Sequence, residues 1–206
     1  PRQRLQAEMI RDQALAISGL LVEKQGGPSV WTYQPKGLWE EIEKRGKFVQ
    51  DHGEKLYRRT LYTRIRRTVP HPSMILFDMP SREVCSVLRA RSNTPLQALS
   101  LLNNVTYVEA AKKFAERMIL NGKSIKDQLS WGFRTATSRY PTESEMTILL
   151  KGYERRLMHY EQNPDQAKDL LLVGESEISN ELNVIHVAAM TTAANLILNL
   201  DEIINK

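Results

Sequence analysis

The sequence predicts a mainly α-helical fold: an irregular multi-helix bundle with a long loop region rich in proline and aromatic residues, and little or no sheet. Apolar residues recur at spacings of three and four along several segments, as in amphipathic helices. Several of these segments begin with the residue pattern of a capping box, which satisfies the first turn of a helix. The chain has 206 residues, 41% of them hydrophobic, enough for one sizeable core or two small ones.

We expect a single helical domain over residues 1–206, in which a loop-rich basic segment, residues 26–91, packs on helices within 94–202. The helical pattern begins at residue 2 and the first residue is not Met, so we expect this chain to be a piece of a longer protein. A missing targeting segment therefore carries no information about localisation.

The first helix is predicted over residues 2–21, where apolar and charged residues alternate with helical spacing. The Gly-Gly-Pro sequence at 26–28 ends any helix before it. Residues 28–53 are predicted to be irregular. Trp31 and Trp39 lie in this stretch, and aromatic residues in a loop usually hold the loop against a core, so we expect that arrangement here.

Residues 55–69 fit two structures. Leu61, Ile65 and Val69 lie four apart, which indicates a helix, but the same residues also fit the alternation of a strand. We favour the helix and leave the strand open. Pro70 and the proline two residues later then break the element.

A short extended segment is predicted at 74–79 and a helix at 81–91. In that helix Cys85 has three aliphatic neighbours, which predicts a buried thiol that packs as a small hydrophobe. The alternative is a reactive thiol, because nearby arginines would lower the pKa of an accessible cysteine.

The remaining helices begin at clear capping signals. Thr94, Thr106 and Thr142 are each followed three residues later by Gln or Glu, and Ser124 is predicted to cap a fourth helix. The last helix is the most apolar and rich in alanine, which predicts a central position. The predicted ranges are 94–104, 106–120, 124–138, 142–161, 165–173 and 180–202.

The net charge of +5 is concentrated in one segment. Residues 55–91 contain nine basic and two acidic residues, a balance of +7, whereas residues 1–54 are balanced at eight of each and residues 92–206 sum to −2. Eight of the nine cations are arginines, whose planar guanidinium suits carboxylate, phosphate and sulfate groups.

These arginines have three interpretations. They form internal salt bridges, they bind acidic groups of a neighbouring domain, or they bind a polyanion such as a sulfated glycan or a nucleic acid. We expect some of the arginines between residues 58 and 67 to remain available to an anionic partner. The candidates are Arg58, Arg59, Arg64, Arg66, Arg67, Arg82, Arg89 and Arg91.

The sequence offers little for catalysis. Asp78, Arg82 and Glu83 are expected to form a local ion network, with a general acid or base as the alternative. The single cysteine excludes an internal disulfide, the sequence contains no CxxCH for haem attachment, and the histidines have no metal-ligand spacing. We therefore expect no metal site and no cofactor in this chain. His186 is expected to be a core residue bonded to a partner.

Ordered motifs along nearly the whole chain carry a family resemblance. They are RLQAEMIRDQALAISGLL (4–21), GGPSV (26–30), YQPKGLWEE (33–41), LYRRTLYT with RRTVP (56–70), FDMPSREVC (77–85), NTPLQALSLLNN (93–104), FRTATSRYPTESE (133–145) and LILNLDEII (196–204). With these motifs the chain resembles the planctomycete-specific C-terminal domain of unknown function found in large, multi-domain bacterial proteins.

The resemblance implies a position after other domains, often planctomycete-type cytochrome c domains, in an exported protein. Haem would then be bound only by those preceding domains, and localisation would be extracytoplasmic, in the periplasm or cell envelope. The family supplies no catalytic residues to carry over.

Our functional expectation is a non-catalytic docking or scaffold domain that binds the preceding domains of the same polypeptide. One alternative is an accessory or catalytic role on an anionic, sulfated or uronic polysaccharide. Another is nucleic-acid binding through the basic segment, which has little aromatic material for base stacking. No apolar run approaches the roughly 20 residues of a membrane span.

Overall fold

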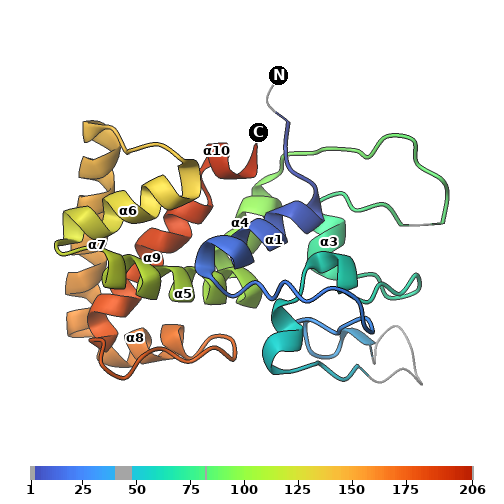
Figure 1. Cartoon of the computed structure of the whole chain (residues 1–206), viewed down its shortest axis with the longest axis horizontal. Coiled ribbons are helices and arrows are strands. Elements are labelled where there is room, and N and C mark those ends of the chain that lie inside the picture. Colours follow the sequence, from blue (N-terminus) through green and yellow to red (C-terminus); the bar gives the residue numbers. More distant parts are fainter. Residues whose placement is uncertain (1–2, 40–47, 82, 206) are drawn as a thin grey trace.

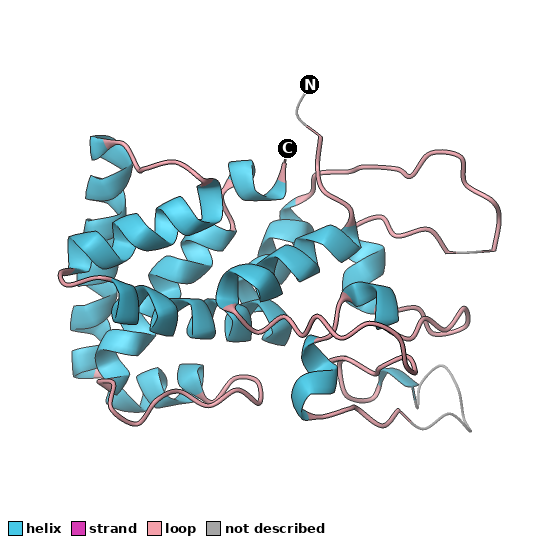
Figure 2. Cartoon of the chain, in the orientation of Figure 1, coloured by secondary structure: helices cyan, strands magenta, loops and turns pink. Residues whose placement is uncertain are grey.

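The computed structural model describes residues 3–39, 48–81 and 83–205. More than half of this part is helical, and its extended pairings are isolated bridges rather than strands (Figures 1 and 2), which confirms the mainly α prediction. The elements are α1 (Ala7–Ser18), η1 (Gly53–Tyr57), η2 (Thr60–Tyr62), α3 (Pro72–Leu76), α4 (Pro95–Asn103), α5 (Val105–Asn121), α6 (Ile125–Thr137), α7 (Glu143–Gln162), α8 (Pro164–Leu171), α9 (Val184–Leu198) and α10 (Asp201–Ile204).

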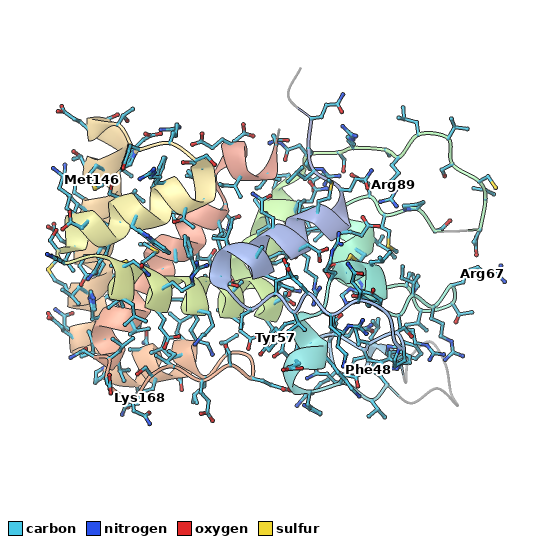
Figure 3. The ribbon with its side chains drawn as sticks, in the orientation of Figure 1. Phe48, Tyr57, Arg67, Arg89, Met146 and Lys168 are labelled. Carbon is cyan, nitrogen blue, oxygen red and sulfur yellow. The ribbon has the colours of Figure 1, made fainter. Side chains whose placement is uncertain are left out.

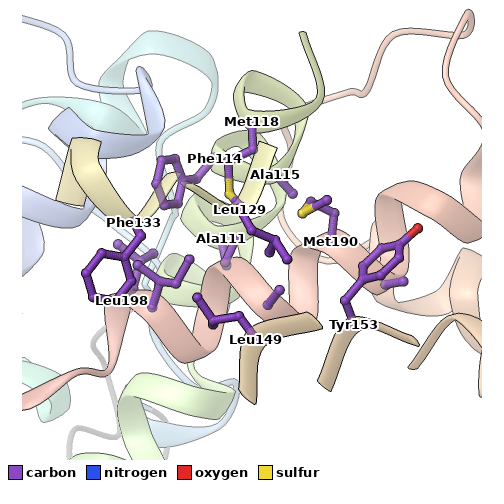
Figure 4. Close-up of a cluster of buried hydrophobic side chains, with 14 of the residues drawn as sticks. Ala111, Phe114, Ala115, Met118, Leu129, Phe133, Leu149, Tyr153, Met190 and Leu198 are labelled. Atoms are coloured by element: carbon purple, nitrogen blue, oxygen red, sulfur yellow. The ribbon is translucent and has the colours of Figure 1, made fainter. Parts of the chain in front are cut away.

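Helices α5 and α9 form the centre of the molecule. Helices α6, α7 and α8 pack around this pair, and the buried side chains of these five helices make the larger hydrophobic cluster (Figure 4). Ala188, Ala189 and Ala194 are fully buried in α9 and let its neighbours approach closely. The predicted central position of the last helix is therefore confirmed.

A second, smaller cluster lies on the other side of α5. It joins α1, the end of α3, α4 and the start of α5 through Ile10, Ala14, Phe77, Leu101 and Tyr107. Helix α1 thus connects the bundle to the loop-rich half of the chain, which lies beyond it in Figure 1.

Three of the predicted helix caps are present. Thr94, Ser124 and Thr142 each accept a bond from the backbone N–H three residues on, and each forms a complete capping box. The box predicted at Thr106 is wrong, because Asn104 caps α5 and accepts from the Thr106 N–H. The Glu109 side chain of that supposed box is buried instead.

Three local predictions between residues 55 and 91 are wrong. Residues 55–69 form no α-helix; they contain η1, η2 and a bridge from Thr63 to Val30. Residues 74–79 are not extended, because α3 begins at Pro72 and runs to Leu76. Among the described residues of 81–91 there is no helix, and the chain forms a long loop (Figure 2).

The aromatic residues of the irregular region pack against one another, and Trp39 is buried among them. Trp39 is 1% exposed, and its ring centroid lies 5.1 Å from that of Trp31 and 6.0 Å from that of Phe48. The Trp39 Nε1–H donates to Gln34 at 2.7 Å. The part of the predicted loop 28–53 that falls in 40–47 lies outside the described residues.

Candidate functional site

The arginines of the basic segment divide into buried and exposed groups. Arg58 belongs to the first group, at 5% exposure. Its Nη2 donates to the carbonyl oxygens of Lys24 at 3.0 Å and Gly26 at 2.5 Å, and its Nη1 donates to that of Pro28 at 2.9 Å. Its guanidinium also lies 3.7 Å from the centre of the Tyr62 ring. Arg58 therefore holds the Gly-Gly-Pro turn and is not exposed to a partner.

Arg11 on α1 performs a similar task and was not singled out from the sequence. This side chain is 3% exposed, and its guanidinium donates to the carbonyls of Leu56 and Arg58 at 2.5 and 2.9 Å. Burial lowers the pKa of Arg11, although the nearby Asp12 carboxylate opposes that shift. Asp12 in turn accepts from the backbone N–H of Thr60 at 2.7 Å. Two consecutive residues of α1, Arg11 and Asp12, thus hold residues 56–60 against this helix.

Arg59, Arg64 and Arg67 are exposed. The Arg59 side chain is 59% exposed, with its Nε 3.7 Å from a carboxylate oxygen of Asp12. The Arg64 guanidinium lies 4.8 Å from the ring centre of Trp31. Arg67 extends away from the body of the molecule and has no hydrogen bond or ion pair to a described residue (Figure 3). Arg66 is partly buried, 5.2 Å from the ring centre of Trp39.

A long loop between α3 and α4 exposes apolar side chains. Val87 is 105% exposed and Leu88 85%, and Val84 is also exposed. Cys85, predicted to be buried, is exposed on the same loop, because the helix that would have buried it does not form. We call residues 83–91 the apolar-basic loop. It projects from the body of the molecule, as Figure 1 shows.

Two arginines hold the end of the apolar-basic loop to the chain's first residues. Arg89 donates to both carboxylate oxygens of Glu8, at 2.8 and 3.0 Å, and Arg91 donates to Gln3. These contacts lie beside the start of α1, and the label in Figure 3 marks Arg89 there.

Of the expected network of Asp78, Arg82 and Glu83, only the two acidic residues lie within the described part of the chain. Asp78 pairs with Arg4, whose Nη2 lies 2.5 Å from its Oδ2, and it accepts from the backbone N–H of Ser92 at 2.7 Å. Burial opposes its ionisation, but the bonds from Ser92 and the charge of Arg4 outweigh it and lower the pKa of Asp78. Glu83 is exposed on the loop, and Arg82 lies outside the described residues.

A buried carboxylate joins the irregular half to the bundle. Glu109 on α5 is 1% exposed and accepts from the Tyr57 hydroxyl at 2.7 Å and from the backbone N–H groups of Glu175 and Ser176 at 2.8 and 2.7 Å. Burial and this carboxylate raise the pKa of Tyr57. These three bonds fix Tyr57 and the loop at 175–176 to α5, so the cluster acts as a structural clamp.

Lys112, one helical turn along α5, completes the clamp. Its ammonium group donates to the carbonyls of Leu171, Val173 and Ser176 at 2.6–3.0 Å. Burial lowers the pKa of Lys112, with the neighbouring Glu109 opposing the shift. No sequence motif identified this pair, because both residues look like the polar face of a surface helix.

Two histidines, His186 and His71, have hydroxyl groups as hydrogen-bond partners. His186 is partly buried and its Nδ1 lies 2.7 Å from the Tyr153 hydroxyl, which confirms the expected partner. His71 is buried between the hydroxyls of Thr32 and Ser73, at 3.0 and 2.9 Å. Burial, followed by the charge of Arg11, lowers its pKa to about 4. Among the described residues, no group of three His, Cys, Asp or Glu side chains is placed to hold a metal ion.

The acidic residues of this region differ in their surroundings. The Asp78 carboxylate accepts at both of its oxygens, the three donors to Glu109 all bond its Oε1, and Glu83 lies on the exposed loop. The exposed arginines and the apolar-basic loop present positive charge and apolar surface on the same half of the chain.

Comparison with known proteins gives the family. The model of PSD1, a protein of unknown function (DUF1553), matches residues 1–153. The chain belongs to this family. The match covers α1, the whole basic segment and the bundle as far as the middle of α7. Neither the curated proteins nor the solved structures include a match. None of the helices in the described part of the chain combines the length and apolar character needed to cross a membrane.

Proposed function

We propose that this PSD1 domain is a non-catalytic docking domain that binds an acidic surface of a preceding domain in the same polypeptide. The resemblance noted from the sequence supports an exported, multi-domain bacterial protein whose preceding domains bind haem. Those domains would carry the cofactor, and the extracytoplasmic location follows from the same resemblance.

The apolar-basic loop is the observation that carries the proposal. Val84, Val87 and Leu88 expose 74%, 105% and 85% of their surface within five residues. Contiguous exposed apolar groups of this kind mark interaction sites on soluble proteins. Arg91 at the end of the loop is exposed and adds positive charge, whereas Arg89 is paired with Glu8, and this charge favours an acidic partner.

The test is to measure binding of this chain to the separately produced preceding domain. The Val87→Ser/Leu88→Ser variant should bind at least about tenfold more weakly, because it removes the apolar centre of the contact. Leu61→Ser is the matched control, since Leu61 is 75% exposed but lies in η2, outside the loop. It should bind like the wild type.

The exposed arginines should increase the affinity for the preceding domain through long-range electrostatic attraction to its acidic surface. The Arg64→Gln/Arg67→Gln variant should bind a few-fold more weakly, and its affinity should depend less steeply on salt than that of the wild type. Equal binding by the loop variant and the wild type would reject the docking surface. If the chain instead binds a polyuronate or a sulfated glycan through these arginines and does not bind the preceding domain, the docking function is wrong and the polysaccharide function is supported.

A further inference from the structure

The start of α1 lacks the cap found on the neighbouring long helices. Gln6 is its N-cap residue, and the Gln6 side chain accepts no capping bond. The first N–H groups of a helix have no intrahelical acceptor and carry partial positive charge. Helix α1 is 12 residues long, so this charge lies at one defined end.

Arg4 lies just before the start of α1 and has buried hydrogen-bond donors without an acceptor. Its side chain is 5% exposed, and its Nη2 donates to the Phe77 carbonyl at 3.2 Å and to Asp78 at 2.5 Å. Its Nε and Nη1 are buried and have no acceptor among the described residues. Buried donors without acceptors cost free energy, so an acceptor is expected beside them.

A cavity of about 10 Å³ lies beside these groups. Arg4, Gln6, Asp78, Arg89 and Arg91 contribute to its lining. This volume holds about one water-sized atom, so a whole sulfate or phosphate does not fit inside it. One oxygen atom of a group that remains outside does fit.

The charges around the cavity leave one cation without an acidic partner. Asp78 pairs with Arg4, and Glu8 pairs with Arg89. Arg91 donates only to the neutral Gln3 among the described residues, and it is exposed at the mouth. The site therefore matches a group with a single negative charge.

We propose that this cavity binds a carboxylate. One oxygen accepts from the unpartnered donors of Arg4, and the other remains at the mouth beside Arg91. The carboxylate comes from an acidic protein side chain or from a uronic acid, which share this chemistry. Binding of a small carboxylate here does not depend on docking by the apolar-basic loop.

The experiment is an NMR titration of the isotopically labelled chain with acetate, observing the arginine Nε–H signals at constant ionic strength. Acetate should shift the Arg4 signal saturably. The Arg91→Gln variant should bind acetate about fivefold more weakly, as expected for losing one charged contact at an exposed site. Arg67→Gln removes an exposed arginine that does not line the cavity, and it should bind acetate like the wild type.

Two further arms identify the source of the carboxylate. Glucuronate and a blocked aspartate dipeptide are titrated in the same way, and tighter binding of one of them assigns the natural ligand to a glycan or to a protein. An unchanged Arg4 signal, an equal response to chloride, or an equal affinity in Arg91→Gln would overturn the proposal. Because only small carboxylates are used, failure here leaves the docking measurements unaffected, and failure of docking leaves this titration valid.

Discussion

The two halves of the molecule satisfy their backbone groups in different ways. In the bundle, α5 to α9 pair their own N–H and C=O groups and bury apolar stripes against each other. The described part of residues 19–71 contains two short 3₁₀ helices, isolated bridges and two α-helical residues, Leu38 and Trp39. There, the guanidinium groups of Arg11 and Arg58 donate to backbone carbonyls that no ladder satisfies.

This difference changes the meaning of the basic composition. Part of the +7 balance stabilises irregular backbone, because each buried arginine has five donors and can bind several carbonyls at once. Only the remaining arginines, such as Arg59, Arg64 and Arg67, are exposed to a partner. Composition alone does not distinguish these two uses.

The bundle should be most sensitive to lost apolar volume. Phe114 on α5 is fully buried, so Phe114→Ala leaves a cavity and should lower the free energy of unfolding by about 3–5 kcal/mol. Urea denaturation monitored by circular dichroism measures it. Leu120→Ala is the control, because Leu120 is on the same helix and 67% exposed. A loss below about 1 kcal/mol for Phe114→Ala would contradict the packing described.

The irregular half should be most sensitive to lost donors. Arg11→Met keeps the apolar stem but leaves the carbonyls of Leu56 and Arg58 without their donor, and should cost about 2–4 kcal/mol. Amide hydrogen exchange should accelerate around residues 56–63 more than in α7. Arg155→Met is the matched control, since Arg155 is exposed on the bundle. Equal acceleration in both halves would show that Arg11 stabilises the molecule as a whole.

Acid should weaken the irregular half through His71. Its folded pKa of about 4 lies below the ordinary value of 6.5, so the unfolded chain binds the extra proton between these pH values. Stability is therefore complete above pH 6.5 and falls as the pH decreases towards 4. Between pH 7.5 and pH 5 the loss should be about 2 kcal/mol.

The His71→Gln variant isolates this effect. Its absolute stability will differ, but the slope of its unfolding free energy between pH 7.5 and pH 5 should be smaller by the amount that His71 supplies. Chemical denaturation at several pH values gives both slopes. Parallel slopes for the two proteins would mean that His71 binds its proton equally well in the folded and in the unfolded chain.

The sequence predicted the bundle better than the irregular half. The reason is that helices depend on neighbouring residues, whereas the irregular half depends on contacts between residues far apart in the sequence. Helix positions and the caps at Thr94, Ser124 and Thr142 depend on residues within one or two turns, so local patterns predicted them. The roles of Arg58 and Glu109 depend on partners 30–67 positions away in the sequence. The spacing of neighbouring residues does not predict contacts over such sequence separations.

The loop between α3 and α4 shows how a local pattern misleads. Its apolar residues have helical spacing, which predicted a buried face and a buried Cys85. No core surface meets that face, and helix formation in a short segment needs such packing. The apolar residues therefore remain exposed, and this error of prediction is what revealed the candidate docking surface.

The smallest expected effect on stability is that of substitutions in the apolar-basic loop. Val87 and Leu88 contact no core, so the Val87→Ser/Leu88→Ser variant should change the free energy of unfolding by less than about 0.5 kcal/mol.

The Cys85 thiol on the same loop should react with a thiol reagent at nearly the same rate in the folded and in the urea-unfolded chain. Adding the preceding domain should slow that reaction in the wild type but not in the double variant, because only the wild type would cover the loop. A destabilised double variant, or slow labelling of the isolated folded chain, would mean that the apolar-basic loop packs on the body of the molecule. The loop would then belong to the fold, as the helices do, and would not be available for docking.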